Sequence, residues 1–223
     1  MSIFSDLLRR IMGDEPATPG GDGERSAAGS VVEAADLEEE EAAQRMAEIM
    51  PQLIERRYKL LALDFDNTIV GVHTMGMWNG TLEELTPFVR PVFRALLQAA
   101  AATEEMNLAV VTFSGQVGLV RGVLASVVGE AYAARVPIRG SDGSWSAPAG
   151  ASQDGKMPHL QSVWDEHMQK TGEQISGMQT VLIDDDRRNI DVGLQHGVAA
   201  LWFNPAEGQG GDRALLDDMM KLD

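Results

Sequence analysis

The sequence contains no cysteine among its 223 residues. Disulfide bonds and zinc sites built from thiolates are therefore excluded. A chain without cysteine fits a reducing compartment, and we expect a cytoplasmic protein.

Long apolar runs are also absent. No stretch of the chain approaches the roughly 18–20 residues of a membrane-spanning helix, so we expect no membrane span. The first twelve residues combine apolar side chains with Arg9 and Arg10, but they lack the apolar core and cleavage pattern of a signal peptide. We predict a short surface helix there, with a docking or membrane-surface helix as the alternative.

Basic residues are few. Lysine and arginine number 18 against 34 aspartates and glutamates, which gives a formal net charge of −16. Such a surface repels polyphosphate backbones, so we expect no nucleic-acid partner. A phosphate-binding pocket in this chain would need its own local positive charge.

The chain divides into three parts by composition. Residues 1–33 form an acidic segment rich in Gly, Pro, Ser and Ala after its short amphipathic start, and this composition predicts a disordered tail. Residues 34–57 are predicted to form a helix, which Pro51 should kink or divide. Residues 58–223 alternate between strand and helix patterns and form the predicted folded domain.

The alternation predicts the fold class. Strands are expected at 59–65, 108–112, 135–138, 180–183 and 198–203. Helices are expected at 91–102, 116–128, 157–170 and 212–222, and a further helix after the fourth strand, through about His196. This order predicts an α/β protein: a Rossmann-like three-layer sandwich with a central parallel sheet of about five strands. Ligands of such sheets lie at the carboxyl ends of the strands, beside the switch point in strand order.

Two carboxylates follow the first predicted strand. Asp64 and Asp66 come at the end of an apolar run, two residues apart. In a regular strand they would share a face and repel each other, so either the chain turns there or a cation lies nearby. A pair of turn-forming aspartates is the alternative.

Three further polar groups stand at or after strand ends or before helices. Thr112 and Ser114 follow the second strand, Lys156 precedes a helix, and the acids at 184–186 follow another strand. Alone, each has an ordinary explanation: a strand-ending hydroxyl, an exposed lysine, or a helix cap. Three consecutive acids, however, exceed what a cap needs.

Together and in this order, the four signals resemble the haloacid dehalogenase (HAD) superfamily. The matching residues are Asp64-x-Asp66-x-Thr68, Thr112, Lys156 and Asp184-Asp185. The resemblance covers about residues 58–203. The segments 68–112 and 112–156 are too short to hold a large cap domain, so we expect a capless member. In this family an open site is associated with larger substrates, including phosphoproteins.

The resemblance implies a Mg²⁺-dependent phosphomonoester hydrolase. Asp64 would be the nucleophile that forms an aspartyl-phosphate, and Asp66 the general acid and base. Thr112 and Lys156 complete the implied catalytic set, because they would bind the phosphoryl group and offset its charge. Mg²⁺ would be held by Asp64, the main-chain carbonyl of Asp66, and Asp185.

Several assignments have alternatives. Ser114 can take the role of Thr112, and Asp184 is expected to orient Lys156 rather than bind metal directly. The outer metal shell can include Asp184, Asn189 or Asp191. His73 and Trp78, in a flap after the first motif, are further candidates for substrate binding. Trp145, Arg139 and Asp142, near the loop before Lys156, are weaker candidates of the same kind.

Two other functions compete with the hydrolase. One is a phosphotransferase of the same superfamily, and the other is a non-catalytic interaction module with a HAD-like fold. The expected partner is a phosphorylated substrate, either a small molecule or a phosphoprotein. The intact set of Asp64, Asp66 and Lys156 favours catalysis over the interaction module.

Overall fold

In the computed structural model, the described residues are 38–146, 154–207 and 209–223. The predicted tail at 1–33, the first residues of the predicted helix at 34–57, and part of the loop before Lys156 lie outside this part of the chain. Among the described residues, no helix combines the length and the apolar character needed to cross a membrane.

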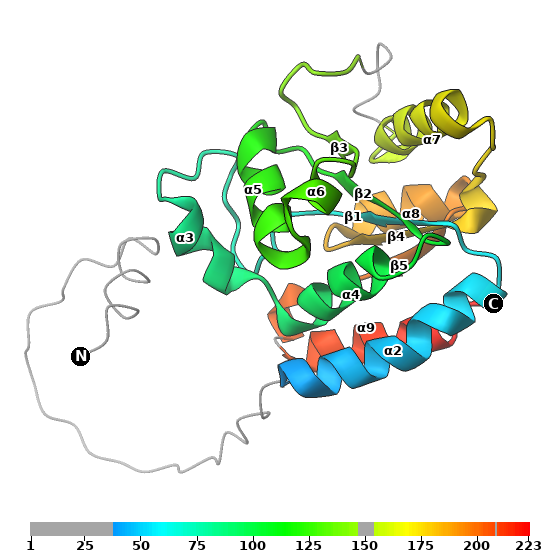
Figure 1. Ribbon diagram of the computed structural model, residues 1–223, viewed down its shortest axis with the longest axis horizontal. Helices are drawn as coiled ribbons and strands as arrows, with labels where there is room; N and C mark the ends of the chain where they lie inside the picture. Colours follow the sequence, from blue (N-terminus) through cyan, green and yellow to red (C-terminus); the bar gives the residue numbers. More distant parts are fainter. Residues whose placement is uncertain (1–37, 147–153, 208) are drawn as a thin grey trace, which may run out of the picture. The chain divides into compact units, whose positions relative to one another are not determined.

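Five parallel strands form the centre of the protein, in the order β3-β2-β1-β4-β5 (Figure 1). The strands are β1 Leu60–Leu63, β2 Asn107–Val111, β3 Ile138–Arg139, β4 Thr180–Asp184 and β5 Ala199–Trp202. The predicted α/β class with a five-stranded parallel sheet is therefore confirmed. Strand order reverses between β1 and β4, which makes that position the switch point.

The register of the central strand aligns its carboxyl end with those of its neighbours. Leu63 in β1 lies opposite Val110 in β2 and Ile183 in β4. The next residue, Asp64, donates its backbone N–H to the Ile183 carbonyl at 2.9 Å. The residues that follow β1, β2 and β4 therefore meet at one edge of the sheet.

Helices cover both faces of the sheet, as the apolar strands require. Leu61 and Leu63 belong to the larger core, with α4 (Pro91–Ala101), α5 (Val117–Val128) and α9 (Gln209–Met220). Leu60 and Ala62 belong to the smaller core under α7, and α8 packs on β4 and β5. The helices of this side are α7 (Met157–Thr171) and α8 (Arg187–Gln195). This arrangement gives the predicted three layers.

Helix α2 (Glu39–Glu55) adds packing outside the layer of α4 and α9 (Figure 1). Its Met46, Ile49 and Leu53 are buried. Pro51 was predicted to kink or divide this helix. It does not divide it, because the helix continues through Pro51 with buried residues on both sides. Packing against α4 and α9 offsets the backbone hydrogen bond that proline removes.

The connections between the strands are short. After β1 the chain forms a flap and then α3 (Leu82–Leu85), a 3₁₀ turn (Thr86–Phe88) and α4. After β2 come α5, α6 (Glu130–Ala133) and β3; later 3₁₀ turns are Gly177–Gln179 and Pro205–Glu207. The described residues contain no inserted cap domain, as expected from the spacing of the motifs.

Candidate active site

Three carboxylates converge at the switch point. Asp64 follows β1, Asp184 ends β4, and Asp185 comes next. One oxygen from each lies within 4.8 Å of the others. Asp64 and Asp184 are only 6% and 1% exposed, so their charges cannot be balanced by water alone.

Lys156 supplies a buried positive charge beside them. It occupies the N-cap position of α7, without a capping hydrogen bond from its side chain, and is 1% exposed. Its Nζ donates to the Asp64 carboxylate at 2.7 Å and to the Val111 carbonyl at 2.8 Å, and lies 3.8 Å from Asp184. A phosphate-binding pocket in this acidic chain would need a local positive charge, and Lys156 places one at the carboxyl edge of the sheet.

One ammonium group does not balance three carboxylates. Burial raises the pKa of Asp64, and burial together with the nearby Asp64 raises the pKa of Asp184 to about 7. Burial also raises the pKa of Asp185. Three convergent carboxylate oxygens suit a hard divalent cation such as Mg²⁺, which would supply the missing positive charge. The residues present therefore fit a metal ion.

Two amide side chains orient the carboxylates. Asn189 Nδ2 donates to both oxygens of Asp184, at 3.0 and 2.9 Å. Asn67 Nδ2 donates to Asp185 at 3.3 Å. Asp191, by contrast, is exposed on α8 and pairs with Arg187 at 3.8 Å. Of the residues considered for the outer shell, the structure thus brings Asp184 and Asn189 into the site and leaves Asp191 outside.

Asp66 is held apart from the cluster by the flap. Its carboxylate accepts hydrogen bonds from the Thr74 backbone N–H at 3.0 Å and hydroxyl at 2.7 Å. His73 Nδ1 lies 3.5 Å from the same carboxylate. Strand β1 ends at Leu63 and the chain turns at Phe65, so Asp64 and Asp66 do not share a strand face. Two aspartates two residues apart therefore occupy different environments.

A glutamine at the start of α5 also anchors the flap. Gln116 accepts from the Trp78 backbone N–H at 2.7 Å and donates to the Trp78 carbonyl at 3.0 Å. The Trp78 indole donates to the Thr81 carbonyl and packs against Phe88. Trp78, a candidate for substrate contact, does not line the cavity of the carboxylates and is held within the flap.

The predicted hydroxyls line the same cavity as the carboxylates. This cavity has a volume of about 520 Å³. Its walls include Asp64, Asp66, His73, Thr112, Ser114, Lys156, Asp184 and Asp185. Thr112 Oγ1 accepts from the Ser114 backbone N–H at 3.1 Å, and Ser114 Oγ accepts from the Gln116 N–H at 3.2 Å. Both hydroxyls line the cavity, so their positions favour neither Thr112 nor Ser114 for the predicted phosphoryl-binding role.

A cluster of aromatic rings in edge-on and tilted contact lies beside Lys156. The Phe113 ring lies 4.2 Å from Nζ, and His159 packs on Phe113 and on Trp145. Burial lowers the pKa of His159 to about 4, assisted by the charges of Lys156 and Arg139, so His159 is neutral near pH 7. Phe113 was not predicted as a site residue, because its only signal in the sequence is its place next to Thr112.

The other loop candidates are engaged elsewhere. Trp145 donates to the Gly140 carbonyl, Arg139 pairs with Glu166, and Asp142 accepts hydrogen bonds from Ser144. None of the three lines the cavity of Asp64.

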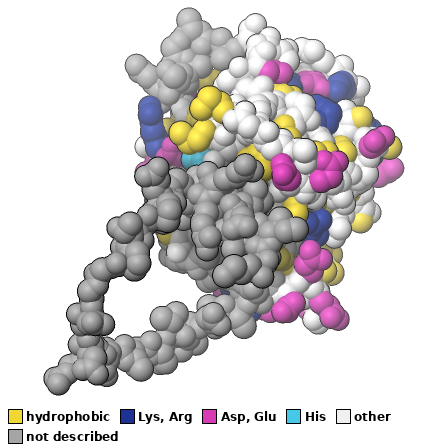
Figure 2. All heavy atoms as spheres, turned by 90° about the vertical axis from the view of Figure 1, so that its left-hand side faces the viewer, with side chains coloured by type: hydrophobic (Ala, Val, Ile, Leu, Met, Phe, Trp, Pro, Cys, Tyr) yellow, Lys and Arg dark blue, Asp and Glu magenta, His cyan; other side chains and the backbone are white. Residues whose placement is uncertain are grey.

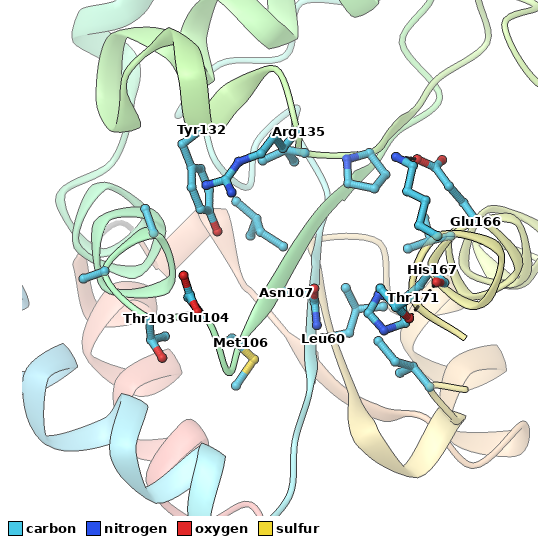
Figure 3. A pocket seen from close by; sticks show the side chains of 18 residues that line it. Leu60, Thr103, Glu104, Met106, Asn107, Tyr132, Arg135, Glu166, His167 and Thr171 are labelled. Carbon is cyan, nitrogen blue, oxygen red and sulfur yellow. Dashed lines mark hydrogen bonds and ion pairs between the residues drawn. The ribbon is translucent and has the colours of Figure 1, made fainter. Parts of the chain in front are cut away.

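A second cavity of about 570 Å³ lies at the opposite edge of the sheet, beside the starts of β1 and β2 (Figure 3). The Arg135 guanidinium lies over the Tyr132 ring there, 5.2 Å from its centre. Its acidic residues, Glu104 and Glu166, do not form a carboxylate cluster that could hold a metal ion. The predicted carboxylates, hydroxyls and lysine therefore lie together at the carboxyl edge.

We expect the buried carboxylates to make the stability of the fold depend on pH and on Mg²⁺. Because folding raises the pKa of Asp184 from 3.8 to about 7, the folded state binds more protons than the unfolded state between these values. This contribution to stability is present at the lower end of that window and is lost as the pH rises. Mg²⁺ binds the deprotonated groups. We therefore expect Mg²⁺ to increase the free energy of unfolding more at pH 7 than at pH 5.

Urea denaturation in EDTA and in saturating Mg²⁺ measures this difference. At each pH, the free energy of unfolding in EDTA is subtracted from that in Mg²⁺. This subtraction cancels the contribution of groups that titrate far from the site. An equal increment at pH 5 and pH 7 would contradict the metal assignment.

The fold and the site define an α/β protein with a lysine and a carboxylate cluster at the switch point of a parallel sheet. No protein-family model and no curated protein matches the sequence. Among solved structures, the chain is similar to the HAD domain of the effector protein Lem4 from Legionella pneumophila, with 15% identity and a TM-score of 0.45, covering 74% of this chain and 95% of that one. The chain is also similar to an inactive mutant of the same domain, with 14% identity and a TM-score of 0.40. That match covers 74% of this chain and 97% of the mutant's.

Proposed function

We propose that the protein is a Mg²⁺-dependent phosphomonoester hydrolase of the HAD superfamily. The observation that carries this proposal is the environment of Asp64. Its carboxylate is buried at the switch point, 2.7 Å from the Lys156 ammonium and within 4.8 Å of Asp184 and Asp185. A carboxylate in this position can attack the phosphorus of a bound phosphomonoester.

The residues around Asp64 suit the remaining steps. Asp66, held by Thr74, would protonate the leaving alcohol as the phosphorus–oxygen bond breaks and Asp64 becomes an aspartyl-phosphate. Asp66 would then take a proton from water, which attacks the phosphorus and releases phosphate and free Asp64. Thr112 and Lys156 would hold the phosphoryl oxygens. Asp64, the main-chain carbonyl of Asp66 and Asp185 would hold Mg²⁺, with the Asp184 carboxylate close enough to join them. The bound ion would neutralise charge on the phosphoryl group.

Hydrolysis of p-nitrophenyl phosphate with and without metal tests this proposal. We expect activity with Mg²⁺, none in EDTA, and recovery when Mg²⁺ is restored. Ca²⁺ should restore activity poorly, because its looser and higher coordination places Asp64 less well for attack. Full activity in EDTA or in Ca²⁺ alone would contradict the proposal.

A further inference from the structure

Two large apolar side chains border the cavity of the carboxylates and are exposed to solvent. Met75 in the flap is 67% exposed, and Phe113 after β2 is 52% exposed. Both line the cavity that contains Asp64. Met77, close by in the flap, is 68% exposed. Exposed apolar surface that adjoins a charged cavity on two sides points to a role in binding.

The backbone at Met75 strengthens this reading. Met75 has a φ of +56°, in the left-handed region that a bulky side chain rarely adopts, and Gly76 follows with +64°. Glycine or asparagine would suit position 75 better. The chain thus carries both backbone strain and an exposed apolar group at one residue, a combination found at functional sites.

The flap and the strand end enclose the mouth of the cavity from two sides. A side chain at Gly76 would lie 3.6–3.7 Å from Ser114 and Gly115, so the flap approaches the segment after β2 at this point. Met75 therefore lies on the flap side and Phe113 on the strand side of one opening. Figure 2, seen from the side of α3, shows hydrophobic side chains gathered beside a histidine on this face.

We infer that Met75 and Phe113 bind the apolar part of the substrate's leaving group. This inference rests on the proposed function and names its substrate class: phosphate monoesters of apolar alcohols or phenols. The phosphoryl group would lie at Asp64, Thr112 and Lys156, and the apolar group would extend between Met75 and Phe113. Leaving groups with further negative charge would be disfavoured by the net charge of −16.

Binding of two phosphonates that the enzyme cannot hydrolyse tests the inference. Hexylphosphonate and methylphosphonate share the phosphoryl mimic and differ only in their apolar chain. By calorimetry in Mg²⁺, we expect the full chain to bind hexylphosphonate about tenfold more tightly, since each fully buried methylene contributes about fourfold and the open mouth buries only part of the chain. Met75→Asn should reduce this preference to about threefold or less, with methylphosphonate binding unchanged.

The chain offers a matched control. Met178 is 81% exposed on a 3₁₀ turn and does not line the cavity, so Met178→Asn should keep the full preference. Asparagine tolerates the left-handed region, so thermal unfolding should show that Met75→Asn folds at least as stably as the wild type. Equal binding of the two phosphonates by the wild type, or no binding of either, would overturn the inference.

Two other outcomes also decide the question. If Met75→Asn weakens both phosphonates equally, the residue positions the flap and does not contact the apolar group, and the inference fails. Hydrolysis of p-nitrophenyl phosphate by the same preparation separates this inference from the proposed function. An active enzyme without the preference loses only the inference. An inactive protein with the preference loses the proposed function, and Met75 and Phe113 would then bind the apolar group of a ligand that is not hydrolysed.

Discussion

Asp64→Asn is expected to lower the rate of p-nitrophenyl phosphate hydrolysis more than about a hundredfold while the protein remains folded. Asparagine preserves the shape of the side chain but removes the charge that attacks phosphorus. The fold should survive because burial already disfavours the charged form of Asp64. Steady-state kinetics in Mg²⁺, together with thermal unfolding of the same preparation, measure both parts of this prediction.

A distant aspartate serves as the control. Asp191 is exposed on α8, outside the cluster, so Asp191→Asn should retain the wild-type rate. If purified Asp64→Asn kept more than about a hundredth of that rate, Asp64 would not be the nucleophile.

Lys156→Met is expected to reduce both activity and stability. Removing one buried donor to a developing charge lowers the rate by about 10²–10³. In EDTA at pH 7 the free energy of unfolding should fall by about 3–5 kcal/mol, because the buried Asp64 and Asp184 lose their positive partner. At pH 5 this loss should shrink, since the raised pKa of Asp184 allows it to be protonated there.

Two further variants make the test specific. Lys170 is 63% exposed and pairs with Glu166 at the surface, so Lys170→Met should change stability little. The double variant Asp64→Asn/Lys156→Met should recover part of the lost stability, because it removes one of the unpaired charges. Unchanged stability of Lys156→Met in EDTA would show that Lys156 does not balance the carboxylates.

Much of the fold was accessible from the sequence because apolar runs that end in polar residues mark buried parallel strands. The predicted strand at 59–65 is observed at Leu60–Leu63, and that at 180–183 at Thr180–Asp184. The polar residues at these ends could be placed at one edge of the sheet for the same reason. The predicted strand at 135–138 is displaced to Ile138–Arg139, because its pairing with Val110 and Val111 decides its position.

Other features depend on tertiary contacts that no local pattern records. Trp78 follows the first motif, yet its direction is set by Gln116 and Phe88, which come later in the chain. Phe113 gains its position over Lys156 only when β2 and α7 are adjacent. The path of α2 through Pro51 likewise depends on the surfaces of α4 and α9 rather than on proline itself.

The position of β1 between β2 and β4 has a consequence for folding kinetics. Asp64 and Lys156 are 92 residues apart in the sequence, and Asn67 and Asp185 are 118 apart. Pairing over such separations is slow, because the intervening chain loses entropy before the contacts form. Until β4 pairs with β1, one edge of the apolar β1 remains open to association with other chains. The same late event that closes this edge brings Asp184 and Asp185 to Asp64, so a partly folded chain has neither a protected sheet nor a complete site.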